Sequence, residues 1–145
     1  MTTLYETDFY AWTQRQSELL RLEEFAEVDW RNLIEEIESW GRSEKHEVEN
    51  RLIVLIMHLL KWAYQPELQS RSWRSTIMVQ RVDLRRLLRD NPSLRAHLTD
   101  FVGDVYPDAV VKASAETGLR KITFPATCPY TAAQIMDDEF WPEEM

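Results

Sequence analysis

Glycine and cysteine are scarce in this sequence. It holds three glycines in 145 residues, where average usage of about 7% would give roughly ten. This scarcity disfavours glycine-rich phosphate-binding loops and folds with many tight β-turns. The one cysteine, Cys128, excludes an intrachain disulfide framework and a zinc site built from several thiolates.

Long hydrophobic runs are also absent. The longest apolar stretch, residues 52–64, contains His58 and Lys61 and is followed by Pro66. It is much shorter than the roughly 20 residues that a membrane-spanning helix needs. The first residues show no basic cluster followed by an apolar segment, as a signal peptide would. We therefore expect no membrane association and a cytoplasmic location.

Positive charge is in deficit, and it is unevenly distributed. The net charge is −8 and the isoelectric point is about 4.9, which disfavours a general nucleic-acid or anionic-membrane binder. Residues 1–49 carry a net −8, residues 50–98 a net +6, and residues 99–145 a net −6. The basic middle segment leaves room for a local basic patch.

Features that favour helices are abundant in the sequence. Leucine (16) outnumbers valine (9) and isoleucine (7), which favours helices over strands. We predict an all-α fold in one domain over residues 1–145. Its architecture is an up-and-down bundle of about five helices, with a mostly extended C-terminal tail that ends in a short helix.

Capping residues mark the first two predicted helices. Asp8 begins a helix that ends near residue 22, and Asp29 begins the next one. An apolar stripe with helical spacing runs along this second helix, and Gly41 is expected to end it. The stripe consists of Trp30, Leu33, Ile34, Ile37 and Trp40.

The third predicted helix begins at Ser43 and is stopped by Pro66. From Leu52 onward it is apolar on nearly every side, so we place it at the centre of the bundle. The six tryptophans are expected to lie mostly in the core, with one or two on a partner-facing patch.

The remaining helices follow from serine, asparagine and proline signals. Ser70 or Ser72 begins a fourth helix, and Asn91-Pro92 begins a fifth that ends at Gly118. We expect a kink or restart in the fifth helix between Gly103 and Pro107. After an extended stretch over residues 122–130, Thr131 and Gln134 form a capping-box pair for the last helix.

His58 is the most distinctive polar residue, because it interrupts the apolar run. One interpretation is a neutral core histidine bonded to a nearby oxygen. The other is a pocket or interface in which His58, Trp62 and Gln65 share a helix face. Trp73 and Arg74 would then approach from the next helix.

The fourth helix carries an arginine stripe, Arg74, Arg81, Arg85 and Arg89. These side chains either bind phosphate or pair with acids of the chain. The candidate acids are Glu35, Glu36, Glu38 and those near the C-terminus. We favour internal pairing. No Glu-x-x-His motif or catalytic constellation occurs, and Cys128 fits a small apolar role, so we expect no metal, cofactor or catalytic residue.

Several short motifs occur in a fixed order along the chain. They are Asp8-Phe9-Tyr10-x-Trp12, Asp29 with Asn32-Leu33-Ile34-Glu35-Glu36-Ile37-Glu38, His58-Leu59-Leu60-Lys61-Trp62-x-x-Gln65-Pro66, Ser72-Trp73, Asn91-Pro92-Ser93-Leu94, Glu116-Thr117-Gly118-Leu119, Phe124-Pro125 and Cys128-Pro129-Tyr130. Together they resemble the bacterial family called domain of unknown function 29, over nearly the whole chain. The resemblance implies a helical fold and a bacterial origin, and it assigns no activity.

Three functions remain from the sequence. The first is a non-enzymatic interaction or regulatory module that uses an aromatic-rich face to bind a protein partner or to form a homodimer. The second is small-molecule binding or an enzymatic activity in a pocket near His58, Trp62 and Trp73. The third is nucleic-acid binding through the stripe from Arg74 to Arg89, which the overall acidity opposes.

Overall fold

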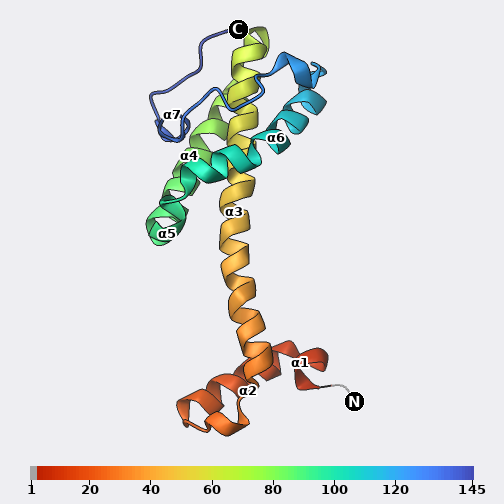
Figure 1. Ribbon diagram of the computed structural model, residues 1–145, viewed down its shortest axis with the longest axis vertical. Helices are drawn as coiled ribbons and strands as arrows, with labels where there is room; N and C mark the ends of the chain where they lie inside the picture. Colours follow the sequence, from red (N-terminus) through yellow and green to blue (C-terminus); the bar gives the residue numbers. More distant parts are fainter. Residues whose placement is uncertain (1–2) are drawn as a thin grey trace. The chain divides into compact units, whose positions relative to one another are not determined.

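The computed structural model describes residues 3–145, in which every regular element is a helix (Figure 1). The prediction of an all-α fold is thus confirmed. The α-helices are α1 (Leu4–Thr7), α2 (Phe9–Arg21), α3 (Trp30–Tyr64), α4 (Arg71–Asp90), α5 (Pro92–Arg95), α6 (Leu98–Thr117) and α7 (Ala132–Met136). Single 3-10 turns occur at Phe25–Glu27, Pro66–Leu68 and Lys121–Thr123.

The chain divides into two compact units, one up to Ser43 and one from Glu44 onward. We call them the N-terminal unit and the C-terminal unit. The helix α3 contributes its first part to the N-terminal unit and its second part to the C-terminal unit. The single domain over residues 1–145 that the sequence predicts stays a prediction.

In the N-terminal unit, both predicted caps are present. The carboxylate of Asp8 accepts a hydrogen bond from the backbone N–H of Ala11 at 3.0 Å, and α2 ends with Leu22 as its C-cap. The carboxylate of Asp29 accepts from the N–H of Asn32 at 3.4 Å, in the first turn of α3. These bonds satisfy amide groups that a helix start leaves without a partner.

The expected end at Gly41 and new start at Ser43 are wrong, because α3 runs through both without a break. A glycine inside a helix is about 1 kcal/mol less favourable than alanine, which is too little to force a break. The guanidinium of Arg42 bridges this turn to Glu35 at 3.2 Å and to Glu38 at 3.9 Å. Residues 41–46 of α3 are all exposed.

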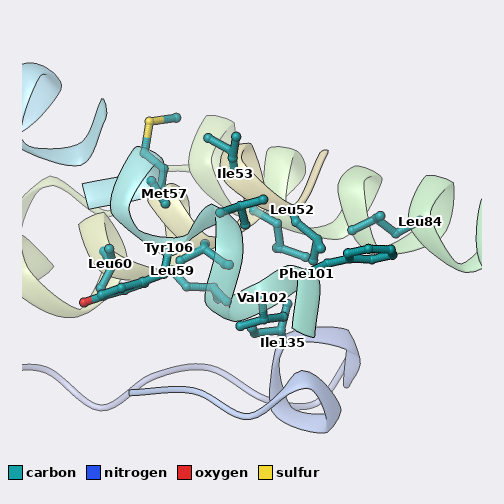
Figure 2. Packing of buried hydrophobic residues seen from close by; sticks show 14 of the residues in the cluster. Leu52, Ile53, Met57, Leu59, Leu60, Leu84, Phe101, Val102, Tyr106 and Ile135 are labelled. Atoms are coloured by element: carbon teal, nitrogen blue, oxygen red, sulfur yellow. The ribbon is translucent and has the colours of Figure 1, made fainter. Parts of the chain in front are cut away.

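The core of the C-terminal unit is built around the second part of α3, as predicted. Leu52, Leu55 and Leu59 have no exposed surface. Figure 2 shows how side chains from α4, α6 and α7, among them Leu84, Phe101 and Ile135, gather with them in one cluster. Such close packing makes each buried aliphatic side chain worth about 1.5–3 kcal/mol.

Two further predictions concern the fourth and fifth helices. Ser70 caps α4 by accepting from the N–H of Trp73 at 3.2 Å, as expected. The predicted fifth helix is instead two helices, because α5 ends at Arg95 and α6 begins at Leu98. Between Gly103 and Pro107 no restart occurs, since α6 continues through Pro107 and loses only one internal donor, and a kink there stays a prediction.

The tail beyond α6 begins where the sequence predicts. Gly118 caps α6 with a left-handed φ of +76°, a conformation that glycine adopts without steric strain. The chain then runs largely without regular structure to α7, where Thr131 and Gln134 form the predicted capping box. Phe124, Ile135 and Pro142 are buried, so the tail belongs to the core of the C-terminal unit.

Candidate functional site

A hollow of about 380 Å³ lies between α2 and the first part of α3, within the N-terminal unit. We call it the α2–α3 groove. Glu36 is its one ionisable lining residue, and it accepts a hydrogen bond from the hydroxyl of Tyr5, which raises the pKa of that phenol. The lining residues are Phe9, Trp12, Thr13, Gln16, Ser17, Leu20, Leu33, Glu36, Ile37 and Trp40.

Asp29 fixes the two helices that form the groove. Its carboxylate accepts a hydrogen bond from Nε1 of Trp12 at 3.0 Å, and its backbone N–H donates to Oε1 of Gln16 at 2.7 Å. Hydrogen bonding lowers the pKa of Asp29, through Asn32 most strongly and also through Trp12. The carboxylate is therefore charged at neutral pH, and it holds α2 against the start of α3.

The surface around the groove is unusually apolar. The large hydrophobic side chains exposed among residues 3–145 number sixteen, and nine of them lie in the N-terminal unit. These nine are Leu4, Phe9, Tyr10, Leu22, Phe25, Trp30, Ile34, Ile37 and Trp40. Three of the nine, Phe9, Ile37 and Trp40, line the hollow. Single exposed apolar residues are ordinary, whereas several that gather at a hollow are typical of an interaction surface.

Four residues of the predicted stripe on the second helix are thus on the surface. Trp30 is 46% exposed, and Trp40 is 61% exposed. Of the six tryptophans, Trp12 is buried, Trp62 and Trp141 pack partly buried against the core, and Trp30 and Trp40 are exposed. The helical spacing of apolar residues cannot by itself distinguish a stripe that is covered within the unit from one that faces solvent.

The N-terminal unit has a very small core of its own. Among residues 3–43, the buried apolar side chains are Trp12, Leu19 and Val28, and Gln16 is the one buried polar side chain. Units of about 40 residues usually need further burial, often through association with another chain. The exposed apolar groove is where such burial is available.

His58 and Gln65 make separate contacts. Nδ1 of His58 lies 2.8 Å from the carbonyl of Val54 in its own helix. Burial lowers the pKa of His58, and Lys61 acts in the same direction. Gln65 donates to the carbonyl of Thr117 at 3.3 Å.

The other three predicted residues meet charged or aromatic neighbours. The ring of Trp62 lies 4.7 Å from that of Trp141, and the guanidinium of Arg74 lies 4.9 Å from the same Trp141 ring. Trp73 instead faces Nζ of Lys61, which is 4.6 Å from its ring centroid. Trp62 and Arg74 therefore belong to the surface on which Trp141 of the tail packs.

The arginine stripe is not a continuous surface. Arg81 is fully buried, and its Nε and Nη2 donate to the carbonyls of Ile135 at 2.8 Å and Phe140 at 2.9 Å. Arg85 pairs with Asp138 at 2.8 Å, which is one of the C-terminal acids considered from the sequence. Arg89 lies 4.0 Å from Asp90, its neighbour in the chain.

The acids considered in the N-terminal unit have partners within that unit. Glu35 and Glu38 face Arg42, and Glu36 faces Tyr5. Sequence reasoning missed the burial of Arg81, although the spacing contains a signal. Arg81 follows Ile77 by four residues and precedes Leu88 by seven, so it lies on the apolar side of α4.

Three further features bear on metal binding, on cysteine chemistry and on membrane spanning. Residues 3–145 contain no group of three or more His, Cys, Asp or Glu side chains placed to hold a metal ion. Burial raises the pKa of the Cys128 thiol, which makes it a poor nucleophile at neutral pH. No helix in this range has the length and apolar character needed to cross a membrane.

Comparison with curated proteins and with solved structures finds no match. A family model does match, and it aligns with residues 4–141 of the 145-residue chain. Its description is "domain of unknown function DUF29". The match includes both units and the tail as far as Trp141. The chain therefore belongs to the DUF29 family.

Proposed function

We propose that this chain is a non-enzymatic protein-interaction module, and that its binding surface is the α2–α3 groove with the apolar side chains around it. The observation that carries the proposal is the exposure of Ile37 (53%) and Trp40 (61%) at a hollow in a unit with three buried apolar side chains. The proposal keeps the expected bacterial origin and cytoplasmic location.

The physical argument is the free energy available from burial. Covering an exposed Ile, Phe or Trp side chain contributes about 1.5–3 kcal/mol. A concave apolar surface between two helices fits a further helix, whose anchors at positions i, i+3 and i+4 enter the hollow. A helix seated there would cover Phe9, Ile37 and Trp40 together, and it would enlarge the small core of the N-terminal unit.

The other two functions expected from the sequence are a small-molecule or enzymatic pocket near His58 and nucleic-acid binding through the arginine stripe. Among residues 3–145, neither is favoured by a specific contact. The ring nitrogen of His58 is used within α3, and Trp62 is packed against Trp141. The arginine stripe is interrupted by the burial of Arg81. We therefore keep the interaction module as the function.

The test is affinity capture from the source organism with three matched baits. They are the wild type, Ile37→Lys at the groove, and Leu68→Lys at an exposed site (54%) in the C-terminal unit. The partners are identified by mass spectrometry, and the fold of each bait is checked by circular dichroism. We expect Ile37→Lys to lose the partners and Leu68→Lys to keep them. Equal recovery by all three baits would exclude the groove as the binding surface.

A further inference from the structure

One face of α4, next to the C-terminal tail, carries a second exposed apolar cluster, which we call the α4 ridge. It consists of Met78 (51% exposed), Val79 (50%) and Val82 (57%). Their spacing places them on one face of the helix, opposite the buried Ile77 and Leu84. An apolar ridge on a helix has the shape that an inter-helical groove accepts.

Arginines lie on both sides of the α4 ridge along the helix. Arg71 precedes it, and Arg86 and Arg89 follow it, all three with exposed side chains. Arg89 makes an exposed pair with Asp90 at 4.0 Å, and the exposed guanidinium of Arg86 lies 3.7 Å from Asp83, a partly buried carboxylate that also pairs with Arg51. Exposed pairs contribute little and can be exchanged for others.

The charges of the two surfaces are opposite. The helix α4 contains six arginines and two aspartates, a net +4. Residues 1–43 contain four basic and ten acidic side chains, a net −6. Residues 44–145 as a whole carry a net −2, and Asp138 and Glu139 of the tail line a hollow with Met78 and Val82. The positive charge beside the ridge is therefore local to α4, whereas the unit that holds the groove is acidic throughout.

We propose that the occupant of the α2–α3 groove is the α4 ridge of a second copy of this chain. The inference rests on the proposed function, and it names the partner. Met78 and Val82, separated by four residues, are the anchors that enter the groove against Ile37 and Trp40. Arg86 and Arg89 of the same helix then approach the acidic unit, Glu36 included.

Charge decides between this contact and the other way to pair two copies. Two grooves facing each other would bring together two units of net −6, which repel one another. The ridge brings apolar surface and positive charge at once, so both contributions favour association. Because the electrostatic part is screened by salt, association through the ridge weakens at high ionic strength. Groove-to-groove pairing would instead strengthen.

The experiment is a complementation measured by analytical ultracentrifugation of the full chain. Ile37→Lys disables the groove, and Val82→Glu disables the ridge, where the new carboxylate lies four residues before Arg86 and supports the helix. Leu68→Lys is the control at an exposed site outside both surfaces. Circular dichroism melting of each variant verifies that it is folded.

We expect the wild type and Leu68→Lys to self-associate, and each disabled variant alone to associate at least about tenfold more weakly. An equimolar mixture of Ile37→Lys and Val82→Glu contains one intact ridge and one intact groove. It should therefore form a one-to-one complex that neither variant forms alone, and raising the salt concentration should weaken that complex.

Three results would overturn the inference: a monomeric wild type, self-association of Val82→Glu equal to that of the wild type, or a mixture that stays monomeric. None of these contradicts the proposed function, because affinity capture tests whether the groove binds any protein, and this does not require the α4 ridge. If Ile37→Lys loses captured partners while the wild type is monomeric, the groove binds another protein. If capture is also unchanged, the proposed function fails as well.

Discussion

Nε of Arg81 in α4 donates a hydrogen bond to the carbonyl of Ile135 at the end of α7, across 2.8 Å. The same guanidinium donates to the carbonyl of Phe140 and lies 5.5 Å from the ring centroid of Trp141. Burial lowers the pKa of Arg81, while Asp138 and Asp137 act in the opposite direction. Nη1 has no hydrogen-bond partner. One buried cation therefore holds the tail through carbonyl groups.

Replacing this cation should loosen the tail. We expect Arg81→Met to lower the free energy of unfolding by about 2–4 kcal/mol, because it leaves buried carbonyls without their charged donor. Arg85→Met removes the exposed pair with Asp138 and should change it by less than about 1 kcal/mol. Urea unfolding gives both values, and limited proteolysis should cut the tail of Arg81→Met first. Equal effects of the two substitutions would contradict the structural role of Arg81.

The central position of α3 makes a second prediction. Leu55 has no exposed surface, so Leu55→Ala should destabilise the chain by about 2–5 kcal/mol through lost contacts and a residual cavity. Ile34→Ala, in the same helix but 53% exposed, should change stability by no more than about 0.5 kcal/mol. Thermal and urea unfolding measure the difference. A Leu55→Ala variant as stable as Ile34→Ala would contradict the placement of the second part of α3 in the core.

The partly buried ring of His58 predicts a pH dependence. Its pKa is lowered from the ordinary 6.5, chiefly by burial. Below pH 6.5 the unfolded chain therefore binds more protons at this site than the folded chain does, so stability falls as the pH falls. Above that value the ring is neutral in both states, and it adds no dependence.

His58→Gln removes this contribution and leaves the other titrating groups in place. The loss of urea resistance between about pH 7.5 and pH 5.5 should be smaller in His58→Gln than in the wild type. Nuclear magnetic resonance titration of the His58 ring gives the pKa directly. A His58 pKa at or above the ordinary 6.5 would refute the assigned environment.

Gly41 and Gly118 should respond to alanine in opposite ways. Gly41 lies inside α3 with open space around its Cα, so Gly41→Ala should stabilise the helix by about 0.8–1 kcal/mol. Gly118 also has open space, but its φ is +76°, so Gly118→Ala should destabilise by about 1 kcal/mol or more. Unfolding midpoints measured in parallel test the pair, and a loss of stability in Gly41→Ala would contradict a continuous α3.

Local signals in the sequence located most of the helix ends. Asp8, Asp29, Ser70 and Thr131 cap helices as predicted, because their bonds are made within one turn. The misplaced end at Gly41 shows the limit of such signals. Glycine weakens a helix without stopping it, and the ion pairs of Arg42 across this turn are visible only in three dimensions.

The candidate site was predicted less well, because burial depends on which elements meet. The stripe from Trp30 to Trp40 was recognised, but its exposure depends on how little of α3 the helix α2 covers. The charge of Arg81 indicates an exposed side chain, whereas its spacing from Ile77 and Leu88 places it on the buried side of α4. His58 and Trp62 share a helix face, yet the ring of Trp62 is occupied by Trp141, from the far end of the chain.

The most direct test of the interaction surface is hydroxyl-radical footprinting of Trp40 under conditions in which the protein binds its partner. Trp40 is 61% exposed in the isolated chain. We expect Trp40 in the wild type to be oxidised several-fold more slowly than in Ile37→Lys, while Leu68 reacts equally in both. Equal oxidation of Trp40 in the two proteins would show that the groove stays open to solvent and is not the interaction surface.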